Sequence, residues 1–415
     1  MMRIFLFLAI VWANTAITAQ SYMGGQSARS RAMNLVNDAD NRMKMMDLEG
    51  AIFAYTNAIQ IDPSYAEAYM KRAIAYTRMR QDTEAMADYN KAMELNPLMN
   101  QLYDERAKLK MLLFDYKGAI TDLNTALALN AYGQNLLDQR ALAKIELNDL
   151  QGAIDDYSAM LQLMPNDTIT YLNRALTYLQ AGNPLQALAD ANKALTLYPK
   201  SALAHNVMGL ILTQQQDYRA AIDAFDQALH SDPEFSLAYY NRGVAHQLNG
   251  NENNAKADFS KAIEINRDLA HAYFNRAVLR KNVGDNMGAI ADYNEVLSID
   301  SVFTDALYNR GVAKKMLGDY NGALADANKS IAQNNANPQL FNFRGNVHML
   351  FGNFDKAILD YNQALQLNAG YAEAFYNRGI AKILNYNRYE GCQDLQKSIE
   401  LGIVDAAEKY NFFCR

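Results

Sequence analysis

The residues best placed to do chemistry in this chain are nine arginines, each followed sixteen residues later by an aspartate. Arg276 and Asp292 are one such pair. The others are Arg72 and Asp88, Arg106 and Asp122, Arg140 and Asp156, Arg174 and Asp190, Arg242 and Asp258, Arg310 and Asp326, Arg344 and Asp360, and Arg378 and Asp394. A cation beside a carboxylate can serve catalysis, but a pair repeated nine times is typical of a structural ion pair, which serves packing specificity more than net stability.

These pairs also predict a local fold. Sixteen residues of continuous helix would separate the two side chains by about 24 Å, too far for contact. Gly284 lies midway between Arg276 and Asp292, and a turn there would bring both side chains level on facing helices. In two places Asp38 and Met208 replace the arginine, and Ala54 and Ala224 replace the aspartate. This joint loss predicts that each arginine pairs with the aspartate of its own hairpin.

Other catalytic or metal-binding patterns are missing from the sequence. The five histidines are His205, His230, His246, His271 and His348, and no two of them share a helix at i, i+4 spacing. There is no HExxH, GxSxG or P-loop motif. We therefore expect no catalytic residue, metal or cofactor, and predict that the protein is not an enzyme.

The two cysteines, Cys392 and Cys414, can form a covalent link. Ile403, beside Gly402, lies midway between them, so an antiparallel hairpin would bring the two sulfurs together. In an exported protein this favours a disulfide, and the alternative is a pair of buried free thiols.

A period of 34 residues organises the chain. Alanines recur at this interval from Ala51 to Ala357, and Gly391 follows on the same count. Counting positions 1–34 from Ala32, position 15 is glycine in five repeats and position 16 is Asp or Asn in ten of eleven. A glycine that ends one helix and a capping residue that starts the next predict two helices per repeat. The eleven repeats start at residues 32, 66, 100, 134, 168, 202, 236, 270, 304, 338 and 372.

Small and large side chains alternate as tightly packed helix pairs require. Position 8 is Ala or Gly and position 20 is Ala, with large residues such as Tyr273 at position 4 and Phe259 at position 24, and five prolines share position 32. Over residues 32–402 the chain resembles the tetratricopeptide repeat family. The resemblance implies an all-α fold, a right-handed α-solenoid whose first helices line a concave groove for peptides or protein segments. Eleven repeats would occupy residues 32–403, and a helix over 404–415 would cap the end.

The first residues predict export. Arg3 precedes an apolar run from Ile4 to Ala13, and small and polar residues follow to Ala19. The run is too short for a hydrocarbon layer of about 30 Å, so residues 1–19 are expected to be a cleaved signal peptide rather than an anchor or a buried helix. Residues 20–31 would then be a flexible tail. We expect an exported protein of the bacterial envelope, periplasmic or extracellular, with no membrane span in the mature chain.

Apolar residues on the groove predict what kind of partner binds. In this family positions 2, 5, 9 and 12 of the first helices line the groove, and from the fifth repeat positions 5 and 9 become mostly apolar or aromatic. The predicted partner-binding residues are Leu172, Leu176, Leu210, Tyr240, Val244, Phe274, Val278, Tyr308, Val312 and Tyr376. The Lys–Asn pair by which co-chaperone members clamp a terminal carboxylate is absent. Alternatively, this stripe of apolar side chains does not bind a partner and is only buried against adjacent repeats.

These features together predict an exported, non-catalytic scaffold that binds a protein or peptide segment with apolar anchors. The net charge of −6 and the lack of a basic run argue against nucleic acid as the partner. The alternative is a structural envelope protein that assembles with copies of itself.

Overall fold

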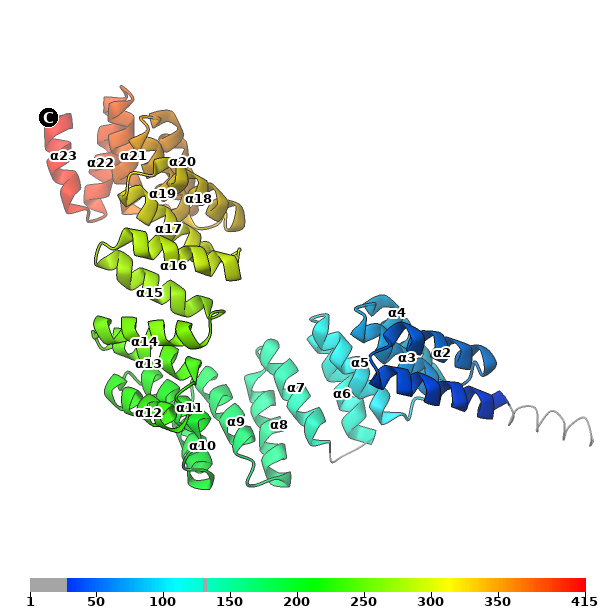
Figure 1. The fold of residues 1–415 in the computed structure, drawn as a ribbon. Coiled ribbons are helices and arrows are strands. Elements are labelled where there is room, and N and C mark those ends of the chain that lie inside the picture. Colours follow the sequence, from blue (N-terminus) through cyan, green and yellow to red (C-terminus); the bar gives the residue numbers. More distant parts are fainter. Residues whose placement is uncertain (1–27, 130–132) are drawn as a thin grey trace, which may run out of the picture. The chain divides into compact units, whose positions relative to one another are not determined.

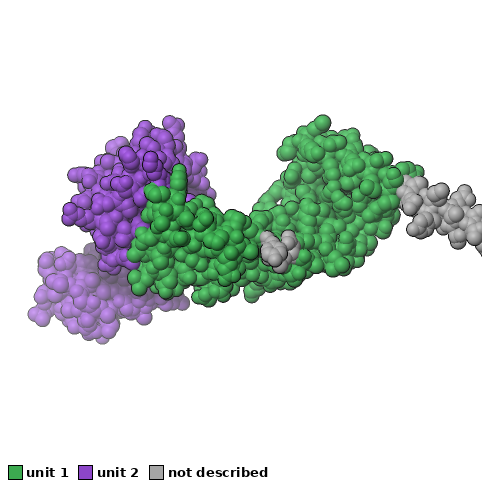
Figure 2. Space-filling model, turned by 90° about the horizontal axis from the view of Figure 1, so that it is seen from below, with its two compact units in different colours: residues 1–199 green, residues 200–415 purple. Residues whose placement is uncertain are grey.

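Helix pairs follow one another along the chain in the computed structural model, which describes residues 28–129 and 133–415 (Figure 1). A helix over residues 28–44 comes first. Pairs then run through α2 (Leu48–Ile61), α3 (Ala66–Arg78), α4 (Asp82–Leu95), α5 (Asn100–Leu112), α6 (Tyr116–Leu129), α7 (Gln134–Glu146), α8 (Leu150–Leu163), α9 (Thr168–Gln180) and α10 (Pro184–Leu197). These residues belong to the first of two compact units, unit 1, which spans Met1–Pro199 (Figure 2).

Unit 2 spans Lys200–Arg415 and has the same organisation. Its helices are α11 (Ala202–Gln214), α12 (Tyr218–Ser231), α13 (Ser236–Leu248), α14 (Glu252–Ile265), α15 (Ala270–Asn282), α16 (Asn286–Ile299), α17 (Thr304–Met316), α18 (Tyr320–Gln333), α19 (Pro338–Leu350), α20 (Phe354–Leu367), α21 (Ala372–Leu384), α22 (Arg388–Glu400) and α23 (Val404–Cys414). From α3 to α21, each odd-numbered helix starts at the first residue of a repeat. The described part of the chain is all-α, as predicted.

The N-terminal helix starts earlier than the repeat pattern indicates. Residues 28–31, expected to belong to a flexible tail, are helical. Arg29 holds this turn in place, because its guanidinium donates to Asp62 at 2.7 Å and lies over the ring of Tyr65 at 3.8 Å. The expected signal peptide, and residues 20–27 of the expected tail, lie outside the described residues.

The turn inside every repeat is built in the same way. Position 15 has a positive φ in all eleven repeats, although it is glycine in only five of them. At Gly284, whose φ is 83°, the following Asp285 N–H donates back to the carbonyl of Arg280 at 2.9 Å and closes the helix end. Asp285 then caps α16 by accepting from the Gly288 N–H at 2.9 Å. The hairpin geometry that places positions 7 and 23 face to face is therefore local.

Small residues let the helices approach closely. The alanines at position 20 are fully buried, and the aromatic rings at position 24, such as Tyr89, Phe259 and Tyr361, pack beside them with almost no exposed surface. The core of each compact unit is thus divided into several small clusters along the series of helices. Among the described helices, none has both the length and the apolar character that a membrane span needs.

Candidate functional site

Every one of the nine arginines binds the aspartate of its own repeat through both its Nε and its Nη2 groups. In the eighth repeat, Arg276 donates through Nε and Nη2 to the two carboxylate oxygens of Asp292 at 2.9 and 2.7 Å. The nine aspartates are only 2–7% exposed. A guanidinium matches a carboxylate in this two-point geometry, and burial removes competing water. The repeated motif therefore joins the two helices of a hairpin.

Each arginine also makes a third contact, which the sequence analysis missed. Nη1 of Arg276 donates to Ser260 Oγ in the preceding repeat at 3.0 Å, and Nη1 of Arg310 donates to Asn294 Oδ1 at 2.7 Å. The corresponding acceptors for the other seven arginines are Thr56, Asn90, Asn124, Ser158, Asp226, Asn328 and Asn362. All of them occupy position 25, where a short polar residue recurs through the first ten repeats. The recurring polar residue at position 25 was the sequence signal from which this third contact could have been predicted.

A second cation approaches most of the buried aspartates from position 11. Arg280 lies 2.9 Å from Asp292, and Lys314 lies 2.9 Å from Asp326. Lys110, Lys144 and Lys382 do the same in their own repeats. His348 takes this place at 3.9 Å from Asp360, and burial lowers its pKa despite the opposing pull of that carboxylate. The polar residues at positions 7, 11 and 23 thus stabilise contacts within and between repeats.

The groove face, defined by positions 5, 6, 9 and 12 of the first helices, is the candidate binding site. In unit 2, the position-5 rings of Tyr240, Phe274, Tyr308 and Tyr376 are each half-buried, so part of each ring is open to a ligand. They recur on successive first helices α13, α15, α17 and α21, with the smaller, buried Asn342 between the last two. Leu210, Val244, Val278 and Val312 at position 9 are half-buried beside them.

Three of these rings, Tyr240, Phe274 and Tyr308, each contact another aromatic ring. Phe274 stacks on Phe303 with ring centres 5.1 Å apart, and Tyr308 meets Phe343 edge to face at 5.3 Å. Tyr240 lies 5.9 Å from Phe259. The stripe is therefore part core and part surface. Phe259 and Phe303 belong to the same repeat as the ring they contact, whereas Phe343 belongs to the repeat after that of Tyr308. Contacts of this kind hold the rings in fixed orientations.

Leu172 does not belong to the candidate surface. It was expected beside the rings of the later repeats, but it is 2% exposed and lies in the interior of unit 1. A leucine at position 5 is short enough to be covered by its neighbours, whereas a tyrosine or phenylalanine extends beyond them. Leu176 in the same helix is exposed, and it belongs to unit 1.

Position 6 also contributes to the groove face, although the sequence analysis did not include it. Asn241 Nδ2 donates to Asn206 Oδ1 at 2.9 Å, and Asn377 Nδ2 donates to Asn342 Oδ1 at 3.0 Å. Asn275 Nδ2 lies 3.5 Å from the Tyr240 hydroxyl. These amides connect one repeat to the preceding one and place polar groups beside the rings.

A pocket of 460 Å³ lies at the C-terminal end of the groove face. Its apolar wall includes Met349, Ile380, Leu384 and Phe412, and Tyr376 lies among them. Asn346 and Asn377 supply polar atoms, and the Asn346 side-chain oxygen Oδ1 accepts from the Tyr361 hydroxyl at 2.7 Å. The pocket is large enough for one or two side chains of a bound segment. It could not be predicted from the stripe, because one wall is the terminal helix α23.

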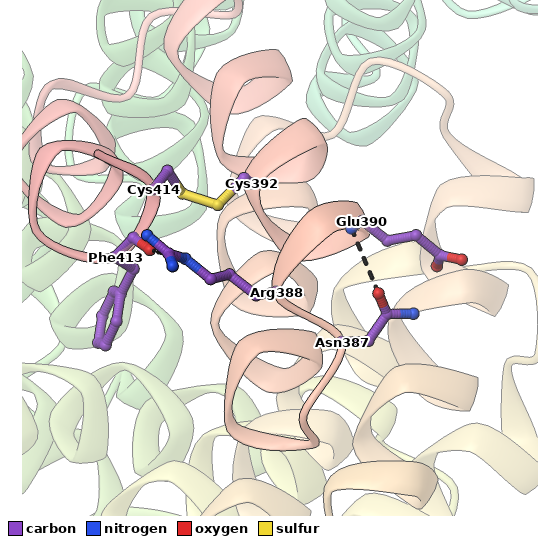
Figure 3. The surroundings of a disulfide bond; sticks show 6 residues. All are labelled: Asn387, Arg388, Glu390, Cys392, Phe413 and Cys414. Atoms are coloured by element: carbon purple, nitrogen blue, oxygen red, sulfur yellow. Dashed lines mark hydrogen bonds between the residues drawn. A yellow bond between two sulfur atoms is a disulfide. The ribbon is translucent and has the colours of Figure 1, made fainter.

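A disulfide fixes that wall. Cys392 in α22 and Cys414 in α23 are bonded, with their Cα atoms 5.8 Å apart, as predicted (Figure 3). Arg388 Nε donates to the backbone carbonyl of Phe413, next to the disulfide (Figure 3). Asn387 caps α22 by accepting from the Glu390 N–H at 3.3 Å. The C-terminal end of α23 is therefore linked to α22, and Phe412 and Phe413 at this end line the pocket.

Comparison with known families explains this architecture. Tetratricopeptide repeat models match residues 44–79, 66–97, 139–202, 172–218, 209–250, 236–269 and 345–383. The chain is a tetratricopeptide repeat protein. Proteins built from this repeat are typically non-catalytic scaffolds that bind protein or peptide segments. The described residues of this repeat protein contain no group of three His, Cys, Asp or Glu side chains placed to hold a metal.

Solved structures of other repeat proteins resemble it. A tetratricopeptide repeat protein from Parabacteroides merdae is 19% identical, covers 70% of this chain and 98% of its own length, and has a TM-score of 0.48. YrrB, described as a tetratricopeptide repeat protein with an unusual peptide-binding site, is 25% identical over 43% of this chain and 92% of its own, with a TM-score of 0.36. MamA is 26% identical over 39% of this chain and 94% of its own, with a TM-score of 0.34. No curated protein matches the sequence.

Proposed function

We propose that this tetratricopeptide repeat protein is an exported scaffold that binds a peptide or protein segment on the groove face of unit 2. The observation that carries the proposal is the row of half-open rings at position 5, Tyr240, Phe274, Tyr308 and Tyr376. Contacts with other aromatic rings orient Tyr240, Phe274 and Tyr308 before a ligand arrives, so little side-chain entropy is lost on binding. Large aromatic anchors in such a setting dominate binding energy at many interfaces.

The polar groups beside the rings suit an extended segment. Asn241 and Asn275 each donate through Nδ2, and among the described residues no hydrogen bond reaches their side-chain oxygens. A backbone N–H of a ligand can donate to such an oxygen while its side chain contacts a ring. The combination of apolar anchors and spaced amides supports recognition of main chain and side chain together.

Export is the second part of the proposal. Residues 1–19 have the charge, apolar run and small residues of a signal peptide. The disulfide between Cys392 and Cys414 supports this assignment, because such bonds persist in oxidising compartments. The protein would then act in the bacterial envelope, in the periplasm or outside the cell.

The test introduces residues that another repeat of the chain already carries at the same positions. The tenth repeat has Asn342 and Asn346 at positions 5 and 9, so Tyr308→Asn with Val312→Asn moves that polar pair into the ninth repeat. Proteins captured from envelope extracts by the wild type should be lost from this variant, while its thermal unfolding stays cooperative. Lys261→Glu, on the second helix α14 and outside the groove-face positions, is the control and should capture normally. Unchanged capture by the double variant would place binding elsewhere.

Self-assembly is the second candidate function. Tyr389, Val404 and Phe412 at the C-terminal end are 75–84% exposed, and exposed apolar groups can contact another copy. Mass measurement in solution separates the two candidates, because a scaffold for other proteins needs no self-association. A concentration-dependent oligomer that Tyr389→Ser with Phe412→Ser dissolves would support self-assembly.

A further inference from the structure

Two lysines on the groove face of unit 2 lack anionic partners. Lys281 in α15 and Lys315 in α17 occupy position 12 of neighbouring repeats, one helical turn beyond Val278 and Val312 of the stripe. Both are half-buried. Among the described residues, neither ammonium has a carboxylate oxygen within 4.0 Å, whereas the adjacent Lys314 binds Asp326 at 2.9 Å. Unlike the cations that point toward the core, these two carry an uncompensated charge.

The surroundings of both ammonium groups are neutral. Lys281 Nζ donates to Asn309 Oδ1 at 2.6 Å, and Lys315 Nζ lies 6.0 Å from the ring centre of Phe343. Burial alone lowers the pKa of Lys281. No residue at positions 5, 6, 9 or 12 of the first helices in unit 2 is Asp or Glu. Asp305 and Glu373, at position 2, form no ion pair with either lysine among the described contacts.

The groove face of unit 1 makes the contrast clear. It carries Asp40, Asp104, Glu105 and Asp138. Its lysines are neutralised in place, since Lys71 lies 2.7 Å from Asp40 and Lys108 lies 3.0 Å from Asp104. The groove-face positions therefore carry acidic residues and lysines with carboxylate partners in unit 1. In unit 2 they carry two lysines without such partners among the described residues.

We infer that the segment bound on the groove face of unit 2 is acidic, with a carboxylate seated at Lys281 and Lys315 and apolar residues on the neighbouring rings. Helices that pack as neighbours lie about 10 Å apart, so two flexible lysine side chains can converge on one carboxylate. A charge-assisted hydrogen bond to a half-buried ammonium is stronger than the bond to a neutral amide that it replaces. Both lysines are half-buried, and the ring of Phe343 lies near Lys315, so water is partly excluded and the attraction is stronger than in bulk solvent. This inference rests on the proposed function.

The experiment compares two fluorescent peptide libraries on the immobilised full chain. The libraries share randomised aliphatic, aromatic and polar flanks and differ only in a fixed central residue, Glu in one and Gln in the other. We expect about tenfold greater retention of the Glu library at low salt, and a smaller preference at high salt. Lys281→Met with Lys315→Met should bring the ratio close to one while both libraries still bind. Methionine is natural at this position in Met43, Met111 and Met349.

Matched substitutions separate this inference from the proposed function. Lys256→Met with Lys329→Met changes two exposed lysines on second helices, and the Glu preference should persist. Equal retention of the Glu and Gln libraries, with loss of both in the Tyr308→Asn, Val312→Asn variant, would overturn the acidic-segment inference and leave groove binding intact. A Glu preference that survives Lys281→Met with Lys315→Met would also overturn it. Retention of neither library by the wild type would overturn both proposals.

Discussion

Arg276 reaches out of its own repeat to Ser260, with 3.0 Å between Nη1 and Oγ, while its other two donors hold Asp292. One guanidinium thereby joins the two helices of a hairpin and the hairpin before it. Because a repeat array is stabilised mainly by contacts within a repeat and between neighbours, a residue that makes both contacts couples the two contributions.

Among the described residues, a second cation lies beside Asp292 but not beside Asp190, and this difference predicts unequal costs for losing the arginine. Asp190 in the fifth repeat has only Arg174 within 4.0 Å among the described cations, so Arg174→Met leaves a buried charge unpaired and should lower the free energy of unfolding by about 3–5 kcal/mol. Asp292 keeps Arg280, so Arg276→Met should cost less, about 2 kcal/mol. Chemical denaturation of both variants measures the difference.

A double-mutant cycle provides the control for that prediction. Adding Asp190→Ala to Arg174→Met reproduces the Met208 and Ala224 combination of the sixth repeat, so much of the loss should return. Additive effects of the two substitutions would show that the residues do not interact energetically.

Removing the disulfide should loosen the C-terminal hairpin. The bond spans a sequence separation of 22 residues, and closing a loop of this size contributes about 3 kcal/mol in the chain-entropy model. Cys392→Ser with Cys414→Ser should speed hydrogen exchange in α22 and α23 and leave α13 unchanged. Thiol labelling of unreduced, denatured wild type should find no free cysteine; labelling of both would show that the bond is open in the isolated protein.

The turns offer a simple route to stabilisation. Phe114 and Tyr386 have φ values of 60° and 64° at position 15, a conformation that costs a residue with a Cβ about 1–2 kcal/mol. Replacing either by glycine should raise the thermal midpoint. Gly284→Ala should lower it by a similar free energy, because nothing lies within 4 Å of the added Cβ and only the backbone is strained. Equal midpoints for Tyr386→Gly and wild type would contradict this explanation.

His348 predicts one component of acid sensitivity. Burial lowers its pKa below the ordinary 6.5, so the unfolded chain binds this proton more readily than the folded chain. Stability should therefore fall as the pH drops below about 6.5 and stop falling once the folded histidine is also protonated. His348→Lys places at position 11 the residue found there in Lys314, and should remove this component. An unchanged pH profile in that variant would assign the sensitivity to other groups.

Cleavage of the signal peptide predicts a difference in fluorescence between the precursor and the mature protein. Trp12 is the only tryptophan, and cleavage after Ala19 would remove it. The mature protein should then show tyrosine emission without tryptophan emission, and its intact mass should lack residues 1–19. A mass that includes these residues in the exported fraction would contradict the cleavage.

Local patterns in the sequence were sufficient for most of the fold. A 34-residue period, capping residues at position 16 and the joint loss of arginine and aspartate predict hairpins, because each depends on residues close together along the chain. The pairing of Arg276 with Asp292 follows from the turn at Gly284, and the link between Cys392 and Cys414 follows from the turn near Gly402. In these cases a short segment of backbone determines which side chains meet.

Contacts between repeats were decided only by the tertiary structure. The burial of Leu172, the bond from Arg276 to Ser260 and the lack of an anionic partner for Lys281 all depend on how adjacent hairpins are packed. The pocket beside Tyr376 depends in addition on where the disulfide holds α23. The sequence by itself therefore determined the repeating unit and its internal pairs. Packing between adjacent repeats determined which groove residues are open, because side-chain length and the contacts of neighbouring hairpins decide whether a side chain is covered or exposed.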